Sequence, residues 1–191
     1  MSKTSILSIV GVAAALTLGG VGAASFARAE TSVTVGGAPM YPSKNIVENA
    51  VNSKDHTTLV AAVKAAGLVD TLAGPGPFTV LAPTNEAFAA LPAGTVDSLL
   101  KPEMKGQLVG VLTYHVLPGA MTAKDIMAKV DAMGGKYSVK TVNGGEVTFM
   151  KSGNGLSVTD AKGDVAMITI ADVIQSNGVI HVINKVLLPA G

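Results

Sequence analysis

The chain has 191 residues, contains no cysteine, and carries 14 Lys and Arg residues against 13 Asp and Glu residues. The lack of cysteine excludes disulfide bonds, thiolate metal sites, cysteine nucleophiles and a lipid-modified cysteine anchor. Arg28 is the only arginine, and proteins that grip phosphates usually need clustered lysines and arginines. The composition therefore argues against nucleic acid as a partner.

Residues 1–29 have the three-part layout of a cleavable secretory signal peptide. A basic residue is followed by an apolar stretch from Ile6 to Val21 and then by the small-residue triplet Ala27-Arg28-Ala29. The stretch is interrupted by glycines and is shorter than the about 20 residues that a membrane-spanning helix needs, so a membrane anchor is the weaker alternative. We expect cleavage before Glu30, export to the periplasm or the exterior, and no stable membrane insertion afterwards.

Residues 30–43, ETSVTVGGAPMYPS, contain two glycines and two prolines and show no sustained periodicity, which predicts a flexible linker. A single domain is expected over residues 44–191. The mature chain, residues 30–191, holds 12 lysines and 13 acidic residues, so its formal charge is −1. Because 48% of the full sequence is hydrophobic, the domain can bury a core without covalent cross-links.

The first half of the domain is predicted to be mostly helical, because its apolar residues recur every three or four positions. Gly67 suits the C-terminus of the second helix. Thr84 is expected to cap a helix N-terminus, and the segment from Thr122 to Asp125 resembles a capping box. The predicted elements are helices at 46–51, 59–66 and 102–112, a buried strand at 78–81, and short helices that begin after Thr84 and after Thr122.

The second half of the domain is predicted to be β-structure from about Lys136 onward. Its segments are rich in β-branched residues or alternate in polarity, and glycine-containing turns separate them, which predicts antiparallel strands. These segments are 137–142, 146–150, 156–159 and 165–170. The nearly continuous apolar run from Val179 to Leu188 predicts a central strand. Helices followed by strands in one chain of this size predict an α+β domain.

The side chains that commonly carry catalysis are few and scattered. His56, His115 and His181 lie far apart in the sequence, and none belongs to a His-Glu-x-x-His motif. There is no Gly-x-Ser-x-Gly motif, and the prolines of GPGP at 74–77 lack the amide donors of a phosphate loop. The segment TDAKGD at 159–164 predicts at most a weak calcium loop, and a solvated turn is the alternative. We expect no enzymatic site, no metal and no cofactor.

Three segments resemble the motifs of the fasciclin domain family, in the same order and with similar spacing: FTVLAPTNEAF from Phe78, LTYHVLPG from Leu112 and NGVIHVINKVLLP from Asn177. The resemblance spans about Ser43 to Pro189. It implies an α+β fasciclin fold, in which a wedge-shaped β-sandwich of two sheets packs against a layer of short helices. It also implies a secreted, non-enzymatic domain for cell adhesion or extracellular matrix interaction.

Two binding sites of the family's adhesive members can be carried over onto this sequence. One is a Tyr-His pair, which falls on Tyr114 and His115, and the other is an acidic residue followed by aliphatic residues, which falls on Asp172, Val173 and Ile174. Each site has a structural alternative: a buried ring that hydrogen-bonds the backbone, and a turn aspartate followed by packing residues. The resemblance implies an extracellular or surface protein or polysaccharide as partner, and it leaves the oligomeric state open.

Two other functions stay open beside adhesion. Some exported fasciclin relatives are associated with carotenoid or lipid binding, and this chain is rich in aliphatic residues. The alternative is therefore a carrier of a small apolar ligand such as a carotenoid or lipid. Hydrolase activity is the weakest alternative, because only scattered Ser, His and Asp residues support it.

Overall fold

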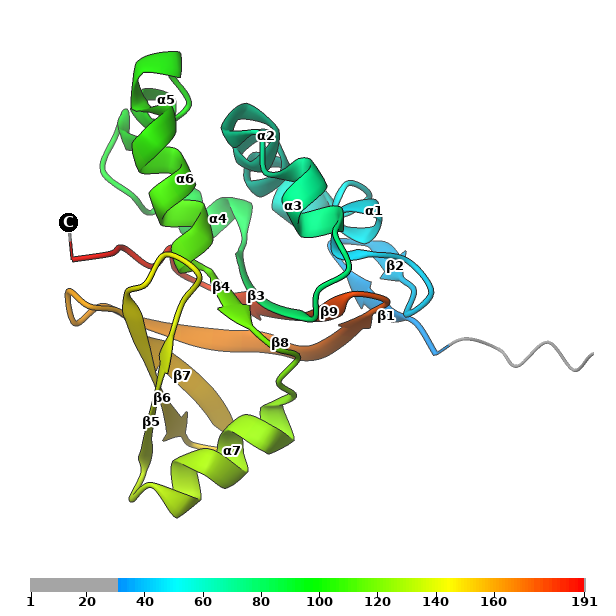
Figure 1. Ribbon diagram of the computed structural model, residues 1–191, viewed down its shortest axis with the longest axis vertical. Helices are drawn as coiled ribbons and strands as arrows, with labels where there is room; N and C mark the ends of the chain where they lie inside the picture. Colours follow the sequence, from blue (N-terminus) through cyan, green and yellow to red (C-terminus); the bar gives the residue numbers. More distant parts are fainter. Residues whose placement is uncertain (1–30, 191) are drawn as a thin grey trace, which may run out of the picture.

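The computed structural model describes residues 31–190, which form a layer of helices over a curled β-sheet, with one further helix on the opposite side (Figure 1). The strands are β1 (Val33–Val35), β2 (Ala38–Met40), β3 (Phe78–Pro83), β4 (Val116–Pro118), β5 (Lys136–Lys140), β6 (Glu146–Ser152), β7 (Gly155–Thr159), β8 (Val165–Gln175) and β9 (Gly178–Ile183). The helices are α1 (Ile46–Ala50), α2 (Thr57–Ala66), α3 (Val69–Ala73), α4 (Asn85–Ala89), α5 (Thr95–Leu99), α6 (Lys105–Tyr114) and α7 (Ala123–Ala132), with 3-10 turns η1 (Lys54–His56) and η2 (Pro102–Met104).

The predicted signal peptide, residues 1–29, lies outside the described residues. Among the helices of residues 31–190, none is long and apolar enough to cross a membrane.

Seven strands form one sheet in the order β4-β3-β9-β8-β7-β6-β5. β3 and β9 are parallel neighbours, whereas the other neighbouring pairs are antiparallel. β8 belongs to both halves of the sheet, and two register shifts between Ile168 and Val173 allow it to bend. The chain after β5 returns to β4, where the Val142 amide donates to the Val116 carbonyl at 2.8 Å. The predicted α+β class is confirmed, and the two sheets of the expected wedge are continuous through β8.

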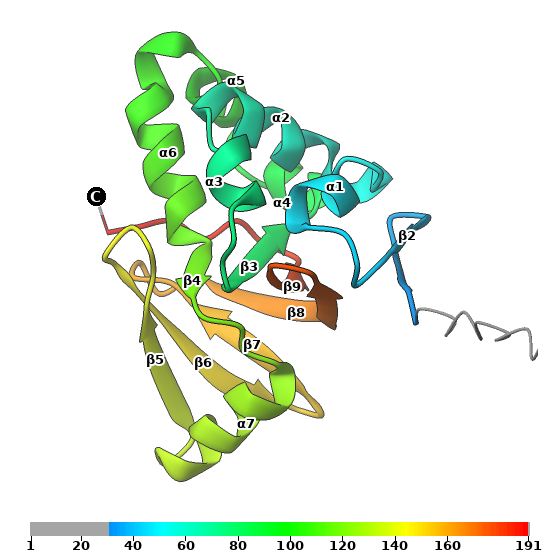
Figure 2. The same cartoon turned by 45° about the vertical axis from the view of Figure 1, so that its right-hand side comes forward.

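The middle of the sheet separates two hydrophobic cores. Val80 on β3 and Ile180 on β9 face the upper core, which lies beneath the helical layer. Leu81 and Ile183 face the lower core, which also contains Phe149 of β6. Figure 2 shows α7 on the lower side, opposite the other helices. Because successive side chains of a strand point to opposite faces, β3 and β9 are buried on both faces, which explains their continuous apolar character.

The predicted helix ends are confirmed by their capping contacts. Gly67 follows α2 in the left-handed conformation, with φ 72°. The Thr84 hydroxyl accepts a hydrogen bond from the Ala87 amide at 3.3 Å, which caps α4. Thr122 and Asp125 make both hydrogen bonds of a capping box at the start of α7. Local sequence therefore determines where these helices begin and end.

Three short elements and several strand ends differ from the prediction, and β8, predicted at 165–170, continues to Gln175. α3, α5 and β4 were not predicted, because elements of three to five residues are too short to show a period. The last strand, predicted to reach Leu188, ends at Ile183. The next residue, Asn184, uses its side-chain oxygen to accept a hydrogen bond from the Met167 amide at 2.8 Å.

Residues 33–40 form a β-hairpin, which corrects the prediction of a flexible linker at residues 30–43. Val35 and Met40 are buried in the upper core. The turn lies directly on η1, because Gly36 has no side chain: an added β-carbon would lie 2.7 Å from the Asp55 nitrogen. The Gly36 carbonyl also accepts a hydrogen bond from the Lys54 amide at 3.2 Å. The Gly-Gly pair between short alternating segments is the hairpin signal that the segment's overall composition obscured.

Candidate functional site

Tyr114, the last residue of α6, is fully buried in the lower core. Its hydroxyl donates to the Glu146 carbonyl at 2.6 Å and accepts from the Ala161 amide at 2.9 Å. Its ring lies against Gly145, where an added β-carbon would be 2.7 Å from Cε2. Burial raises the pKa of the hydroxyl. Tyr114 therefore joins α6 to β6 and to the turn before β8.

His115 is buried beside Tyr114 and bonds the backbone through both ring nitrogens. Nδ1 donates to the Val111 carbonyl at 2.8 Å, and Nε2 accepts from the Leu187 amide at 2.9 Å. These two bonds require the neutral ring with its proton on Nδ1. Burial lowers the pKa of His115 to about 4. The ring joins the end of α6 to the C-terminal segment. His115 is thus a buried ring that hydrogen-bonds the backbone, which was the structural alternative to a binding role.

Asp172 joins β8 to the start of α7. Its carboxylate accepts a hydrogen bond from the Ala123 amide at 2.6 Å, at the helix end where the dipole favours an anion. Its own amide donates to His181 Nδ1 at 3.2 Å, and His181 Nε2 donates to the Met121 carbonyl at 2.8 Å. Asp172 has φ 58°, a left-handed conformation that Asp tolerates better than most residues. This contact network organises the fold between β8, β9 and α7.

Val173 and Ile174, the other two residues of the predicted second site, point to opposite faces of β8. Val173 is fully buried in the upper core, whereas the Ile174 side chain is 42% exposed. Of the five predicted site residues, Ile174 alone is exposed, and Asp172 is half-buried with its carboxylate engaged. The two predicted sites therefore do not form a common exposed surface, and their role in binding stays a prediction.

The acidic turn at 159–164 is held by its own backbone. Asp160 is buried, and its Oδ1 accepts from the Lys162 and Asp164 amides, each at 2.9 Å. Its Oδ2 accepts from the Leu188 amide at 2.9 Å. The carboxylate therefore organises the turn and holds the C-terminal segment. Within residues 31–190, no group of three His, Asp or Glu side chains could hold a metal ion.

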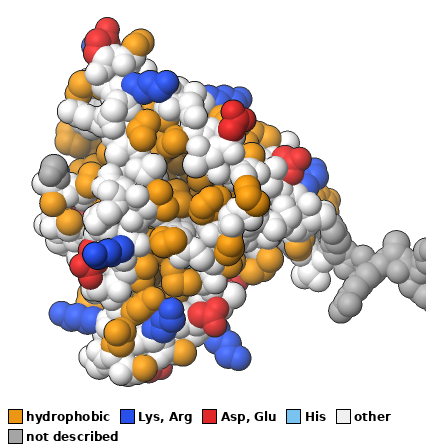
Figure 3. All heavy atoms as spheres, viewed as in Figure 1, with side chains coloured by type: hydrophobic (Ala, Val, Ile, Leu, Met, Phe, Trp, Pro, Cys, Tyr) orange, Lys and Arg blue, Asp and Glu red, His pale blue; other side chains and the backbone are white. Residues whose placement is uncertain are grey.

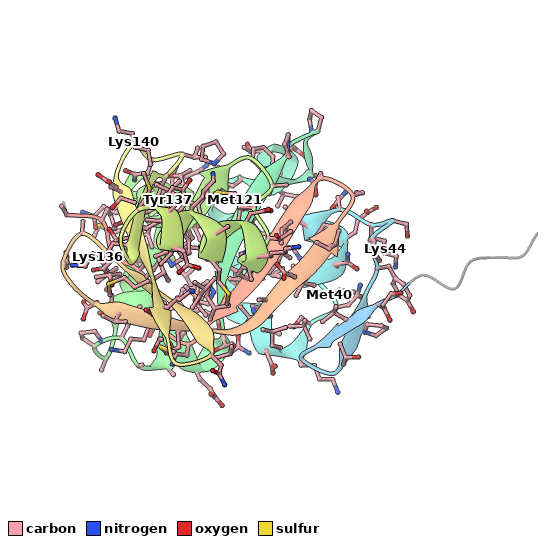
Figure 4. The ribbon with its side chains drawn as sticks, turned by 90° about the horizontal axis from the view of Figure 1, so that it is seen from below. Met40, Lys44, Met121, Lys136, Tyr137 and Lys140 are labelled. Carbon is pink, nitrogen blue, oxygen red and sulfur yellow. The ribbon has the colours of Figure 1, made fainter. Side chains whose placement is uncertain are left out.

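A surface that sequence reasoning missed lies where α7 meets the edge strand β5. We call it the α7–β5 surface and define it by Lys129, Met133, Lys136, Tyr137 and Lys140. The Met133 side chain is 63% exposed. Lys129 Nζ donates to the Tyr137 hydroxyl at 3.0 Å and lies 4.9 Å from the centroid of its ring. Figure 4 shows Tyr137 between Met121 and the strand lysines Lys136 and Lys140.

This surface is positively charged, whereas the mature chain as a whole has a formal charge of −1. The segment 123–140 holds four lysines and two aspartates. Of the two aspartates, Asp125 is engaged in the capping box of α7, and Asp131 forms an ion pair with Lys151 at 2.6 Å. Of the two exposed lysines of β5, Lys140 lies opposite Glu146 in register, whereas Lys136 lies opposite Met150. A lysine and tyrosine surface of this kind suits an anionic, hydroxyl-rich partner.

A second feature absent from the prediction is an apolar pocket in the upper core, between α1, α2, α3 and the strands β3 and β9. It has a volume of about 50 Å³. Figure 3 shows hydrophobic side chains gathered on the face between α6 and α3, beside this pocket. Its lining brings together residues from 40 to 180 in the sequence, so no local pattern could have revealed it.

Comparison with known proteins agrees with this architecture. Residues 54–189 match the family described as the fasciclin domain. The protein sll1483 of Synechocystis sp. is 46% identical over 176 residues, covering 92% of this chain and 90% of that protein. A second Synechocystis protein, sll1735, is 42% identical over 147 residues, covering 75% of this chain and 97% of that protein.

A solved structure shares the fold. The FAS1 domain pair from the insect cell adhesion molecule fasciclin I matches with a TM-score of 0.70 and 15% identity, covering 84% of this chain and 58% of that chain.

Proposed function

The chain belongs to the fasciclin domain family, and on that premise we propose that it is an exported, non-enzymatic adhesion domain that binds an anionic polysaccharide of a cell surface or matrix. The similar fold of a domain pair from an insect cell adhesion molecule supports an adhesive role. The signal-like residues 1–29 support a location in the periplasm or outside the cell.

The observation that carries the proposal is the α7–β5 surface. Two side chains are already held together there, because Lys129 and Tyr137 share a hydrogen bond and a cation–π contact. A preorganised pair loses less side-chain entropy on binding than two free side chains would. Lys136 and Lys140 extend from the same edge strand and provide charge for an anionic chain. Tyr and Met, both present here, are enriched at binding surfaces.

The buried polar groups support a non-enzymatic role. His115 and His181 each have both ring nitrogens hydrogen-bonded to the backbone. The Tyr114 hydroxyl has two backbone partners. General acid–base work requires a group within hydrogen-bond reach of a substrate proton. The side chains of His115, His181 and Tyr114 would have to lose these structural hydrogen bonds before they could exchange a proton with a substrate.

The test compares binding of the mature protein to immobilised dextran sulfate, an anionic polysaccharide, with binding to neutral dextran. We expect binding to dextran sulfate alone, weakened by salt because the contact is electrostatic. The double variant Lys136→Ala/Lys140→Ala should lower the affinity about tenfold, since each exposed ionic contact contributes up to about 1 kcal/mol. Removing Lys101 and Lys105, which are exposed at the helical end, is the matched control and should leave the affinity unchanged.

Tyr114→Phe tests whether the family-based site or the α7–β5 surface binds dextran sulfate. The variant loses a buried hydroxyl with two backbone partners, so it should unfold more easily, by about 1–3 kcal/mol. Its affinity for dextran sulfate should be that of the wild type below the melting transition. Equal losses in both lysine double variants, or tighter binding to polyglutamate than to dextran sulfate, would contradict the proposal.

A further inference from the structure

The apolar pocket of the upper core has room for a ligand. Its walls include Val47 of α1, Val63 of α2, Leu72 of α3 and Ile180 of β9, and Met40 of the N-terminal hairpin forms another part of the lining. A pocket of about 50 Å³ exceeds the about 10–15 Å³ that one water molecule needs. It suits a compact molecule and is too small to enclose a carotenoid or a whole lipid.

Water is a poor occupant for this pocket. Its lining is almost entirely aliphatic, and a buried water molecule needs two to four polar partners. Apolar cavities of this kind remain dry and accept small apolar molecules instead. An empty pocket also leaves its lining side chains without van der Waals partners on one side, so an occupant would restore these contacts.

One polar atom in the pocket wall has no partner. His56 lines the pocket and is 2% exposed. Its Nδ1 is turned toward Ser53 Oγ at 2.9 Å, and Ser53 is not among the lining residues. Nε2, on the other side of the ring, is buried without a hydrogen-bond partner among the described residues. Burial lowers the pKa of His56 by more than the Ala82 backbone and Asp55 raise it, so burial favours the neutral ring.

A neutral His56 can bind an oxygen atom. With Nδ1 accepting from the Ser53 hydroxyl, Nε2 carries the proton and can donate it to a ligand oxygen. With the other tautomer, Nε2 accepts a hydrogen bond from a ligand hydroxyl. A single hydroxyl on an otherwise apolar body therefore satisfies Nε2 in either case. Ser53 holds this ring through its contact with Nδ1. The hairpin turn at Gly36 lies directly on the backbone of η1, the turn that contains His56.

We propose that this pocket binds a compact apolar molecule carrying one hydroxyl or carbonyl oxygen, which hydrogen-bonds to His56 Nε2. The site is separate from the α7–β5 surface and does not depend on the adhesive function. Parts of its wall, from Met40 to Ala50, lie outside residues 54–189, the segment that matches the family. The N-terminal hairpin therefore helps to build the site.

The test uses ethanol and ethane, which have the same two-carbon body and differ in the hydroxyl. Each is titrated into the mature protein labelled at Leu and Val methyl groups, and NMR shifts give the affinity and the location. We expect shifts at Val47, Val63 and Leu72 with both probes, and an affinity for ethanol about 3- to 10-fold higher, the gain of one hydrogen bond. His56→Phe should remove this difference between the probes.

A second pair of variants keeps the test decisive if His56→Phe folds poorly. Ala50 is half-buried in the pocket wall, so Ala50→Leu should fill the space and abolish the shifts. Ala61→Leu adds the same atoms on the exposed face of α2 and should bind both probes as the wild type does. Binding to dextran sulfate should be unchanged in both variants, which separates this site from the proposed adhesion. Methyl shifts outside the pocket, or equal affinities of the wild type for ethanol and ethane, would overturn the proposal.

Discussion

At the scale of single residues, the side chains that resembled a binding motif act mainly as structural bridges. Tyr114 and His115 each connect two distant backbone segments, and Asp172 connects β8 to α7. A buried polar group without partners costs free energy, so such residues are strongly constrained even when they never touch a ligand. The fold therefore gives Tyr114, His115 and Asp172 a structural role, whether or not they also contact a partner. Binding by Ile174, the exposed member of the set, is compatible with this structure.

His115 predicts how stability depends on pH. Its ordinary pKa of 6.5 falls to about 4 in the folded state because of burial. Since the unfolded chain takes up a proton that the folded state excludes, the stabilisation is complete above pH 6.5 and declines as the pH falls to about 4. The loss is about 3 kcal/mol in the free energy of unfolding. Burial also lowers the pKa of His56 and of His181, which adds to the effect in the same direction.

Urea denaturation at neutral pH and near pH 4 measures this loss. In His115→Gln the free energy of unfolding should be lower at neutral pH, because the hydrogen bonds to Val111 and Leu187 are disturbed. Its further decrease on acidification should be smaller than in the wild type by about 3 kcal/mol. An equal decrease in both proteins would show that His115 is not the source.

At the scale of elements, capping signals proved more informative than composition. Thr84 and the Thr122–Asp125 box stand where helices begin, because a side-chain oxygen next to free amides acts within a few residues. The hairpin at 33–40 has a weak local signal because each strand has only three residues, whereas Val35 and Met40 pack into the upper core. Tertiary burial thus stabilises an element whose local signal is weak.

Gly36 and Gly37 give a matched test of how this hairpin is attached. Both have positive φ, 58° and 75°, so alanine at either position costs about 1 kcal/mol in backbone strain. An added β-carbon at Gly36 would also lie 2.7 Å from the Asp55 nitrogen, whereas at Gly37 it would have nothing within 4 Å. We expect Gly36→Ala to speed hydrogen exchange at the Val35 and Met40 amides strongly, and Gly37→Ala to change it little. Similar exchange in both variants would mean that the turn does not anchor the hairpin.

At the scale of the whole molecule, β3 and β9 couple the two cores. Each strand places alternate side chains above and below the sheet, so neither core can form without both strands. The hydrogen bond from the Leu187 amide to His115 also connects the two halves. This arrangement predicts one cooperative folding unit, with the helical layer and the α7 side unfolding together.

Phe149→Ala tests this cooperativity from the lower core. Phe149 is fully buried, so the substitution should lower the free energy of unfolding by about 3–5 kcal/mol. Urea unfolding should remain a single transition. Hydrogen exchange of the slowest amides in α2, on the far side of the sheet, should accelerate with those of β6. A two-step transition in which α2 keeps its protection would show that the halves unfold independently.

The sequence by itself determined the local features of this protein: the helix ends at Gly67, Thr84 and Thr122, the antiparallel strands after Lys136, and the three motifs that resemble the fasciclin family. These depend on backbone preferences and on contacts a few residues apart. The tertiary structure alone decided that β3 lies parallel to β9, that Tyr114 and His115 are buried, and that the pocket and the α7–β5 surface exist. Each of these results from side chains that are distant in the chain, and burial and pairing between such residues are set by the packing of the complete fold.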